Sequence, residues 1–201
     1  MMPGIGNIAR VASRTAPDSL RLVQDLVNTL DIETGEDALT DDGGLGAFLR
    51  DHEVPAGRGG VTAPREQREA LGELRELREA LREVCLAHTA GAAVPEPAAR
   101  TLERLFAAAP LVLDVRPDGG AALRPAAGLG GVAYLTALVA AGIAAAVADR
   151  TWSRLKACEA HDCRWVFYDK SPAGRSRWCT MAVCGSRAKM RTYRARRAES
   201  E

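Results

Sequence analysis

Four of the five cysteines in the chain lie close together near its C-terminal end. Cys158, Cys163, Cys179 and Cys184 form the pattern C-x4-C-x15-C-x4-C, two equally spaced pairs separated by a loop. Tetrahedral zinc takes four thiolate or imidazole ligands, and two such pairs surround one ion without closing a long stretch of chain. The pattern predicts one Zn²⁺ ion bound by these four cysteines. Because catalytic zinc keeps a position open for water or substrate, a site with four thiolates is expected to be structural.

Other interpretations of these cysteines stay open at this point. Disulfide bonds need an oxidising compartment, and the N-terminal sequence MMPGIGNIARVASRTAPD has no continuous apolar segment of the kind that directs export. Four buried, unreactive cysteines would not need paired and equal spacing. His161 lies between the first two cysteines and could replace one of them as a ligand, although four thiolates already complete a tetrahedron. The sequence therefore favours zinc in a reducing, cytoplasmic setting.

A run of basic residues directly follows the last cysteine. Ser186 is expected to N-cap a helix in which arginines recur on one face from Arg187 onward, and no acidic residue interrupts it before Glu199. The alternative is a solvated terminal helix, but such helices usually mix charge signs. Arginine side chains suit phosphate oxygens and guanine edges, so the predicted partner is a nucleic acid. The predicted nucleic-acid-binding residues are Arg187, Lys189, Arg191, Arg194, Arg196 and Arg197 in the helix, and Lys170, Arg175 and Arg177 in the loop before it.

The two parts of the chain carry opposite net charges. Residues 1–149 contain 14 Arg and no Lys against 21 Asp and Glu, a net charge of −7. Residues 150–201 contain 13 Lys and Arg against 5 Asp and Glu, a net charge of +8. Four zinc-bound thiolates would still leave the second part strongly positive. The asymmetry indicates that the C-terminal part meets a polyanion and that the acidic part is a separate scaffold or sensor.

Aromatic residues are concentrated between the cysteine pairs. Trp165, Phe167, Tyr168 and Trp178 lie there, four of only nine Phe, Trp and Tyr residues in the chain. A small zinc module needs apolar side chains to shield the metal, so their expected role is a small core around it. The alternative is a platform on which the bases of single-stranded nucleic acid stack.

The rest of the chain is predicted to be mainly α. Asp18 or Ser19 is the expected cap of the first helix. The helices expected from apolar periodicity cover residues 18–30, 45–51, 65–88, 98–109 and 131–156. The run LVLDV at residues 111–115, followed by an Asp118-Gly119 turn, predicts one small β-hairpin packed on helices. Residues 1–15 are expected to be disordered and residues 53–64 to form a loop.

Two of these helices have a second interpretation. In residues 65–88 an apolar seam recurs every three or four positions, which fits the core of a helix bundle or, alternatively, a dimeric coiled coil. Residues 131–148 are uncharged and long enough to span a membrane. However, eight of these 18 residues are alanine and no basic residue directly flanks their N-terminal end. A buried core helix, without a membrane partner, is the favoured interpretation.

The C-terminal sequence CEAHDCRWVFYDKSPAGRSRWCTMAVCGSRAKMRTYRARR resembles the zinc finger of the CGNR family of bacterial proteins, named for a Cys-Gly-Asn-Arg motif. The motif here is Cys184-Gly185-Ser186-Arg187, with Ser in place of Asn, and both residues are good N-caps. Upstream, LVQDLVNTLD at residues 22–31 is similar to a helix of the ABATE domain that precedes this finger. After the segment at 1–15, the resemblance implies an ABATE-like helical domain at 16–150 and a CGNR-type finger at 151–198.

The resemblance also implies a role in stress-induced transcription regulation. The four cysteines would bind zinc and the finger would bind DNA. By analogy with one-component regulators, the helical domain would sense a small-molecule effector, with Asp25, Asn28 and Thr29 as candidate polar groups of a pocket. Alternatively, these three residues only satisfy helix ends and neighbouring loops.

We therefore expect a cytoplasmic DNA-binding regulator, with a homodimer formed through the N-terminal domain because one small finger binds weakly. Two alternatives are an RNA-binding or ribosome-associated zinc module, and a protein-interaction zinc module attached to an enzyme domain. The enzyme hypothesis is weakened because residues 1–149 offer only His52, His88 and Cys85 as thiol or imidazole groups, with no spacing that links them. We predict that the protein is not an enzyme.

Overall fold

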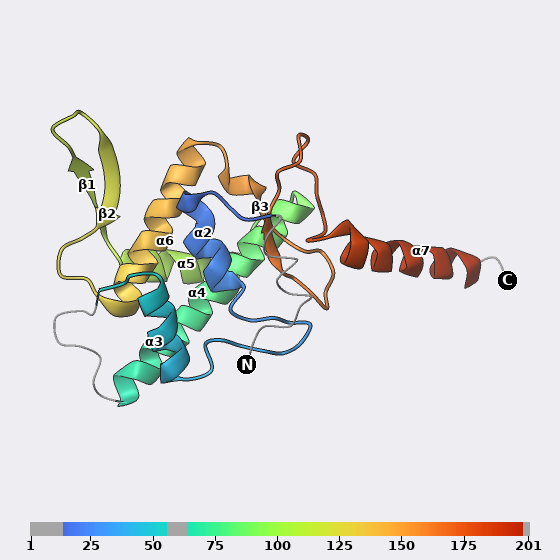
Figure 1. Ribbon diagram of the computed structural model, residues 1–201, viewed down its shortest axis with the longest axis horizontal. Coiled ribbons are helices and arrows are strands. Elements are labelled where there is room, and N and C mark those ends of the chain that lie inside the picture. Colours follow the sequence, from blue (N-terminus) through green and yellow to red (C-terminus); the bar gives the residue numbers. More distant parts are fainter. Residues whose placement is uncertain (1–13, 56–63, 199–201) are drawn as a thin grey trace.

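A computed structural model describes residues 14–55 and 64–198 of the protein. Its helices form one body, from which a hairpin projects at one end and the last helix at the other (Figure 1). The elements in chain order are α2 (Asp18–Val27), α3 (Asp42–Asp51), α4 (Pro64–Ala90), α5 (Glu96–Ala107), β1 (Leu111–Val115), β2 (Ala121–Pro125), α6 (Gly131–Ala148), the 3-10 turn η1 (Trp152–Arg154), β3 (Leu155–Ala157), β4 (Val166–Tyr168), the π-helical turn η2 (Met181–Gly185) and α7 (Ser186–Ala198). The fold is mainly α, as predicted. The predicted disorder at 1–15 and the predicted loop at 53–64 lie largely outside the described residues.

The core of the body is formed where α2, α4 and α6 pack together. On α2, Leu20 and Val23 are fully buried, which is the outcome expected for an apolar stripe on one face of a helix. On α4, Leu74, Leu77 and Leu81 are buried in the same cluster. Helices of the same chain therefore cover the apolar seam of α4, which supports the bundle over the coiled coil.

Several helix ends differ from the prediction. The N-cap of α2 is Pro17, whose backbone is extended, and neither Asp18 nor Ser19 caps the helix. This helix ends at Val27 instead of Leu30, because Leu30 forms a β-bridge with Asp37 in the following loop. The prediction that the last helix of the body continues to Lys156 is also wrong.

That helix, α6, ends at Ala148 for a local reason. Arg150 has a φ of 56°, in the left-handed region, and the backbone N–H of Thr151 donates to the carbonyl of Ala146 at 2.8 Å. A left-handed residue with a hydrogen bond back into the last turn is a common way to terminate a helix. The other boundaries shift less: α3 begins at Asp42 after the N-cap Asp41, and α5 covers Glu96–Ala107.

Within the described residues, α6 is the one helix that is apolar and long enough to cross a membrane by length and composition. Core helices often meet the same two criteria. Here Val132, Leu135 and Val139 are buried in the cluster shared with α2 and α4. These residues place one side of α6 in the core, and 33% of the segment is buried.

Two antiparallel hairpins occur among the described residues, of which the sequence predicted one. The predicted hairpin pairs β1 with β2, and Leu113 lies opposite Leu123. The second pairs β3 with β4, and Ala157 lies opposite Val166. It was missed because each of its strands has only three residues, too short for a periodic pattern to show.

Candidate metal centre and basic helix

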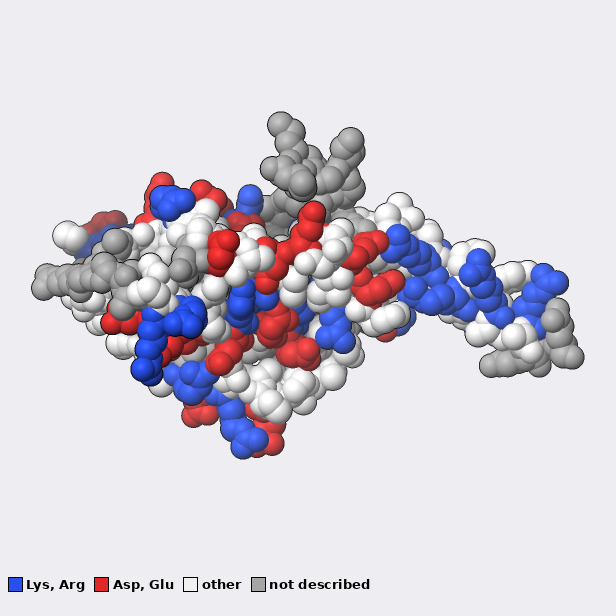
Figure 2. Space-filling model, turned by 90° about the horizontal axis from the view of Figure 1, so that it is seen from below, with Lys and Arg blue, Asp and Glu red and all other residues white. Residues whose placement is uncertain are grey.

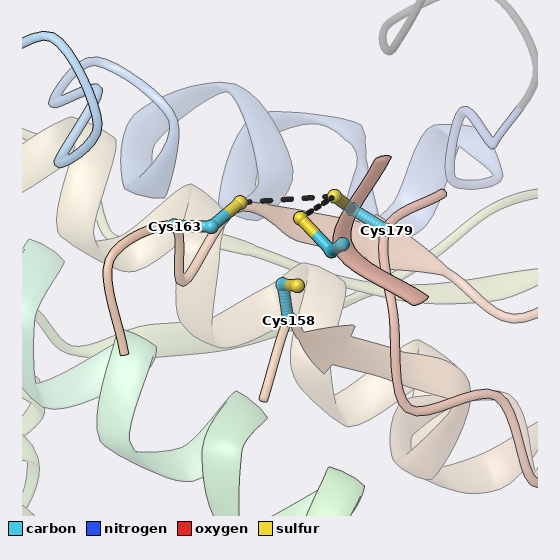
Figure 3. Close-up of side chains that lie close together, drawn as sticks. Cys158, Cys163 and Cys179 are labelled. Atoms are coloured by element: carbon cyan, nitrogen blue, oxygen red, sulfur yellow. Dashed lines mark hydrogen bonds between the residues drawn. The ribbon is translucent and has the colours of Figure 1, made fainter. Parts of the chain in front are cut away.

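The four predicted zinc ligands meet in one buried cluster. Cys158 follows β3, Cys163 lies in the next turn, and Cys179 and Cys184 lie before and within η2. All four sulfur atoms lie within 4.8 Å of one another, and none of the four residues is more than 3% exposed. Figure 3 shows the side chains of Cys158, Cys163 and Cys179 converging from different segments. Among the described residues, this is the one group of three or more His, Cys, Asp or Glu side chains with this arrangement.

The spacing of the sulfur atoms fits zinc. The Sγ atom of Cys179 lies 3.7 Å from that of Cys163 and 3.6 Å from that of Cys184. A tetrahedron with zinc–sulfur bonds of about 2.3 Å has sulfur–sulfur edges of about 3.8 Å. A disulfide would need about 2.05 Å, and all four thiols are free. The cluster is therefore the site of one structural Zn²⁺ ion. His161 is exposed and lies outside this group of donors.

The thiols also influence one another's protonation. Hydrogen bonds from Cys163 and Cys179 lower the pKa of Cys158. The same contacts with Cys158 raise the pKa of Cys163, and raise that of Cys179 to about 12. Burial raises the pKa of Cys184. One thiolate is thus stabilised at the expense of its neighbours. A bound divalent cation supplies the charge that allows all four to ionise, so zinc affinity depends on pH.

Aromatic side chains enclose the cysteines. Trp165 and Phe167 are buried in the same cluster, at 6% and 1% exposure, and the half-buried Trp178 packs against it. Tyr168 packs on the main helical core. The expected small core around the metal is therefore present. Buried rings have no free face, so Trp165 and Phe167 cannot serve as a stacking platform in this structure.

The last cysteine pair leads directly into the basic helix. The turn η2 contains Cys184 and runs without a break into α7. A Cβ atom on Gly185 would lie 2.6 Å from the Sδ atom of Met181 and 3.3 Å from Trp178, so a larger residue here would have to push the flexible Met181 side chain aside. Ser186 does not N-cap the helix as predicted. Because the turn before it is already helical, Ser186 has helical backbone angles and donates its hydroxyl to the carbonyl of Met181 at 3.0 Å.

The basic residues of α7 line a helix that extends from the body into solvent. Figure 2 shows lysine and arginine along this projection, whereas both charge signs are mixed on the body. Every residue from Lys189 to Ala198 is exposed, and α7 buries no side chain. One predicted contact residue has a partner already, because the Nη1 atom of Arg187 lies 2.8 Å from the Oε1 atom of Glu33.

The loop before η2 presents the three other predicted basic residues. Lys170 and Arg175 are exposed, and Arg177 forms an ion pair with Glu159. The fully buried Asp169 organises this loop, since its carboxylate accepts hydrogen bonds from the backbone N–H groups of Ser171 and Ser176 at 3.0 and 2.8 Å. Burial opposes ionisation of this carboxyl, but these hydrogen bonds hold its pKa well below the usual value.

Apolar contacts and hydrogen bonds both join the finger to the helical body. Leu155, Ala157 and Val166 of its hairpin belong to the main core cluster, together with residues of α2, α4 and α6. The Nη2 atom of buried Arg82 in α4 donates to the carbonyl of Val27 at 2.8 Å, and its Nη1 atom donates to the carbonyl of Arg164 at 3.2 Å. The N-terminal region and the finger therefore share one core at this interface.

The sequence offered little signal for this interface. Arg82 is 1% exposed, yet it is one of many alternating arginines and glutamates in the predicted helix. The three proposed pocket residues also make contacts within the protein. Asp25 pairs with Arg21 on the surface, Asn28 bonds to the backbone of β4, and the Thr29 hydroxyl donates to the carbonyl of Leu26. A pocket at these three residues stays a prediction, and the contacts of Asn28 and Thr29 fit the alternative of satisfied local groups better.

A helical body fused to a four-cysteine zinc site and a basic terminal helix defines a zinc-finger protein with an N-terminal helical domain. Residues 154–197 match the CGNR zinc finger. Residues 20–150 match the ABATE family, described as "Putative stress-induced transcription regulator". The chain belongs to this family, and both predicted resemblances are confirmed. Neither family is one of enzymes. No curated protein matches the chain.

Proposed function

We propose that the protein is a cytoplasmic transcription regulator that binds duplex DNA through α7. The observation that carries this proposal is a basic helix with no packing role: α7 buries no side chain and contains six Arg and Lys residues without an acidic one. Like charges three and four residues apart destabilise an isolated helix, and helices this short are marginal in water. A polyanion would supply negative charge along this helix. Phosphate contacts would give affinity, and arginines in a groove would give any sequence preference.

Zinc would act on DNA binding by fixing the start of α7. Cys184 immediately precedes Gly185 and the first turn of the helix. Removal of the metal would free this turn, so that the helix loses its direction relative to the body. Metal binding and DNA binding are therefore expected to be coupled.

RNA binding is the second candidate, and the aromatic residues distinguish it from DNA binding. Sequence-specific recognition of single-stranded RNA relies on bases stacked against exposed aromatic rings. Trp165 and Phe167 are buried and cannot stack on a base, which leaves Tyr193 of α7, 61% exposed, as the ring that a single strand could use. A direct competition between duplex DNA and single-stranded RNA of the same sequence tests the proposed preference for duplex DNA, and tighter binding of the single strand would reverse it.

Binding of a labelled DNA duplex at several salt concentrations tests the main proposal. We expect a steep salt dependence that is lost in chelator. Replacing Lys189, Arg191 and Arg194 by alanine should reduce the slope of log K against log salt by about 0.9 for each lost phosphate contact. The matched control replaces Arg65, Arg68 and Arg100, which are exposed on α4 and α5. Unchanged binding by the α7 triple variant would refute the proposal.

Dimerisation is proposed to occur through the β1–β2 hairpin. Side chains alternate between the faces of a strand, so Leu113, Val115 and Leu123 share one face. They are 64%, 66% and 40% exposed. The opposite face carries an ion pair between Asp114 and Arg124 at 2.7 Å. A twofold axis brings identical patches together, so an uncharged apolar face is complementary to itself.

The mass of the protein in solution, measured by light scattering, tests this interface. Double substitution of Leu113 and Val115 by lysine should give a monomer. The control is Val112→Lys on the opposite face, which should leave the dimer intact. A monomeric wild-type protein would contradict the proposal.

A small-molecule effector bound by the helical domain would act on the finger through the interface between α2 and β4.

A further inference from the structure

The first arginine of α7 is held by an acidic residue of the helical domain. Arg187 is the last residue of the Cys184–Arg187 motif, and its guanidinium pairs with Glu33 in the loop between α2 and α3 at 2.8 Å. This hydrogen bond raises the pKa of Arg187, because the carboxylate favours the charged guanidinium. The pair joins the base of α7 to the helical domain, whereas the hydroxyls of Ser186 and Thr192 donate to carbonyls of η2 and of α7 itself.

The loop that carries Glu33 is fastened to the helical domain. The Asp31 carboxylate accepts from the backbone N–H of Glu33 at 2.9 Å, and the backbone carbonyl of Asp31 accepts from Gly35 at 2.7 Å. Further along, the Asp37 carboxylate accepts a 2.7 Å hydrogen bond from buried Arg78 of α4. Burial opposes ionisation of Asp37, but the bond from Arg78 keeps its pKa below the usual value. Glu33 is therefore held in position by contacts that do not involve α7.

This placement brings negative charge to the base of the basic helix. Figure 2 shows acidic residues on the body beside the point where α7 leaves it. A phosphate that approaches Arg187 meets a guanidinium whose charge is already balanced by Glu33. It must displace that carboxylate to form an ion pair with the arginine, and it is repelled by the carboxylate while it does so.

We propose that Glu33 is an internal counter-ion of Arg187 that DNA must displace. Through this contact the helical domain lowers the affinity of the basic helix for DNA. This inference rests on the proposed binding of DNA by α7. In this arrangement Arg187 differs from Arg191 and Arg194, for which the structure records no acidic partner among the described residues. Any change that moves the Asp31–Asp37 loop away from the finger would release Arg187 and strengthen binding.

Glu33→Gln tests the inference, with Glu36→Gln as the matched control. Glu36 is exposed in the same loop and forms no ion pair within the part of the chain described. Both variants remove one negative charge, but only the first removes the partner of Arg187. We expect Glu33→Gln to bind a duplex of arbitrary sequence about two- to fivefold more tightly at low salt, and Glu36→Gln to change the affinity less. The salt slope should increase by about 0.9 with Glu33→Gln alone.

The same substitution in an Arg187→Ala background completes the test. Without the arginine there is no partner to release, so Glu33→Gln should there have no larger effect than Glu36→Gln. Equal effects of the two glutamate variants in the wild-type background would overturn the inference, as would an undiminished Glu33→Gln effect in the Arg187→Ala background. If neither the wild-type protein nor any variant binds the duplex, the proposed function fails and the inference fails with it. Bound zinc and helix content, measured on every variant, identify a folding defect.

Discussion

The side chain of Asn28 forms two 2.8 Å hydrogen bonds with the backbone of Val166 in the zinc finger. Its Oδ1 atom accepts from the N–H of Val166, and its Nδ2 atom donates to the carbonyl of the same residue. A neighbouring strand would make the same pair of bonds. Because Asn28 is the C-cap of α2 and Val166 begins β4, this side chain ties the end of α2 directly to a strand of the finger.

Asn28→Ala should destabilise the folded protein by about 1–3 kcal/mol, because it leaves two backbone groups of Val166 with fewer partners at a buried interface. Urea unfolding of the zinc-bound protein measures the change. Asp25→Ala serves as a control, since it breaks only an exposed ion pair with Arg21 and should cost no more than about 1 kcal/mol. Equal losses in the two variants would contradict a structural role for Asn28.

Removal of zinc should weaken α2 and α4 as well as the finger. The finger residues Leu155 and Val166 are buried in the core cluster of these helices. Loss of the metal should therefore expose part of the apolar surface of α2 and α4. Hydrogen exchange of backbone amides, with and without chelator, measures the effect. Protection in α2 and α4 should fall with chelator and also in Cys184→Ser.

A second cysteine provides the control for that experiment. Cys85 is fully buried in α4 and lies outside the metal cluster, and burial raises the pKa of its thiol to about 12. Cys85→Ala should lower stability through lost packing but leave the response to chelator intact. If chelator changes exchange only in the finger, the helical core is independent of the metal.

Arg82→Lys should destabilise the protein by about 1.5–3 kcal/mol even though the charge is kept. The planar guanidinium reaches the carbonyls of Val27 and Arg164 at the same time, and an ammonium group on a flexible chain cannot replace this geometry. Thermal unfolding of the variant gives the loss. Arg65→Lys, an exposed position on the same helix, should behave like the wild-type protein.

The metal ligands could be predicted because the sequence pattern that identifies them lies within one short segment. The four cysteines lie within a short stretch, and their spacing alone indicates a zinc site. The helix of residues 65–88 was also predictable, since its apolar seam is long and regular. The start of α7 near Ser186 was predicted as well, but its cap was not, because a π-helical turn before Ser186 replaced the cap that a serine at this position normally provides.

The interface between the finger and the body was beyond sequence reasoning for a different reason. It depends on residues far apart in the chain, such as Asn28 with Val166 and Arg82 with Arg164. An asparagine after a helix and an arginine in a charged helix are both typical of solvent-exposed positions. Here the tertiary packing places both residues at the contact between the two regions. The opposite net charges of these regions had indicated that they are separate units.

His88 should make the stability of the protein depend on pH in mildly acidic solution. Its ring packs edge-on against Trp152, with ring centroids 5.0 Å apart, and its Nδ1 atom lies 2.9 Å from the carbonyl of Leu155. Burial lowers the pKa of His88 from its usual value of 6.5; the carbonyl of Leu155 opposes the shift and the charge of Lys156 adds to it.

Because the folded protein binds this proton less readily than the unfolded chain, its stability should decrease as the pH falls below about 6.5. The decrease should stop once the folded state also takes up the proton. His88→Gln keeps a hydrogen-bond donor for Leu155 but removes this titration. The free energy of urea unfolding, measured at several pH values with zinc bound, should therefore fall less steeply between about pH 7 and pH 5 in the variant than in the wild type. Acid effects on the thiolates occur in both proteins and cancel in the comparison, so parallel curves would show that His88 does not contribute.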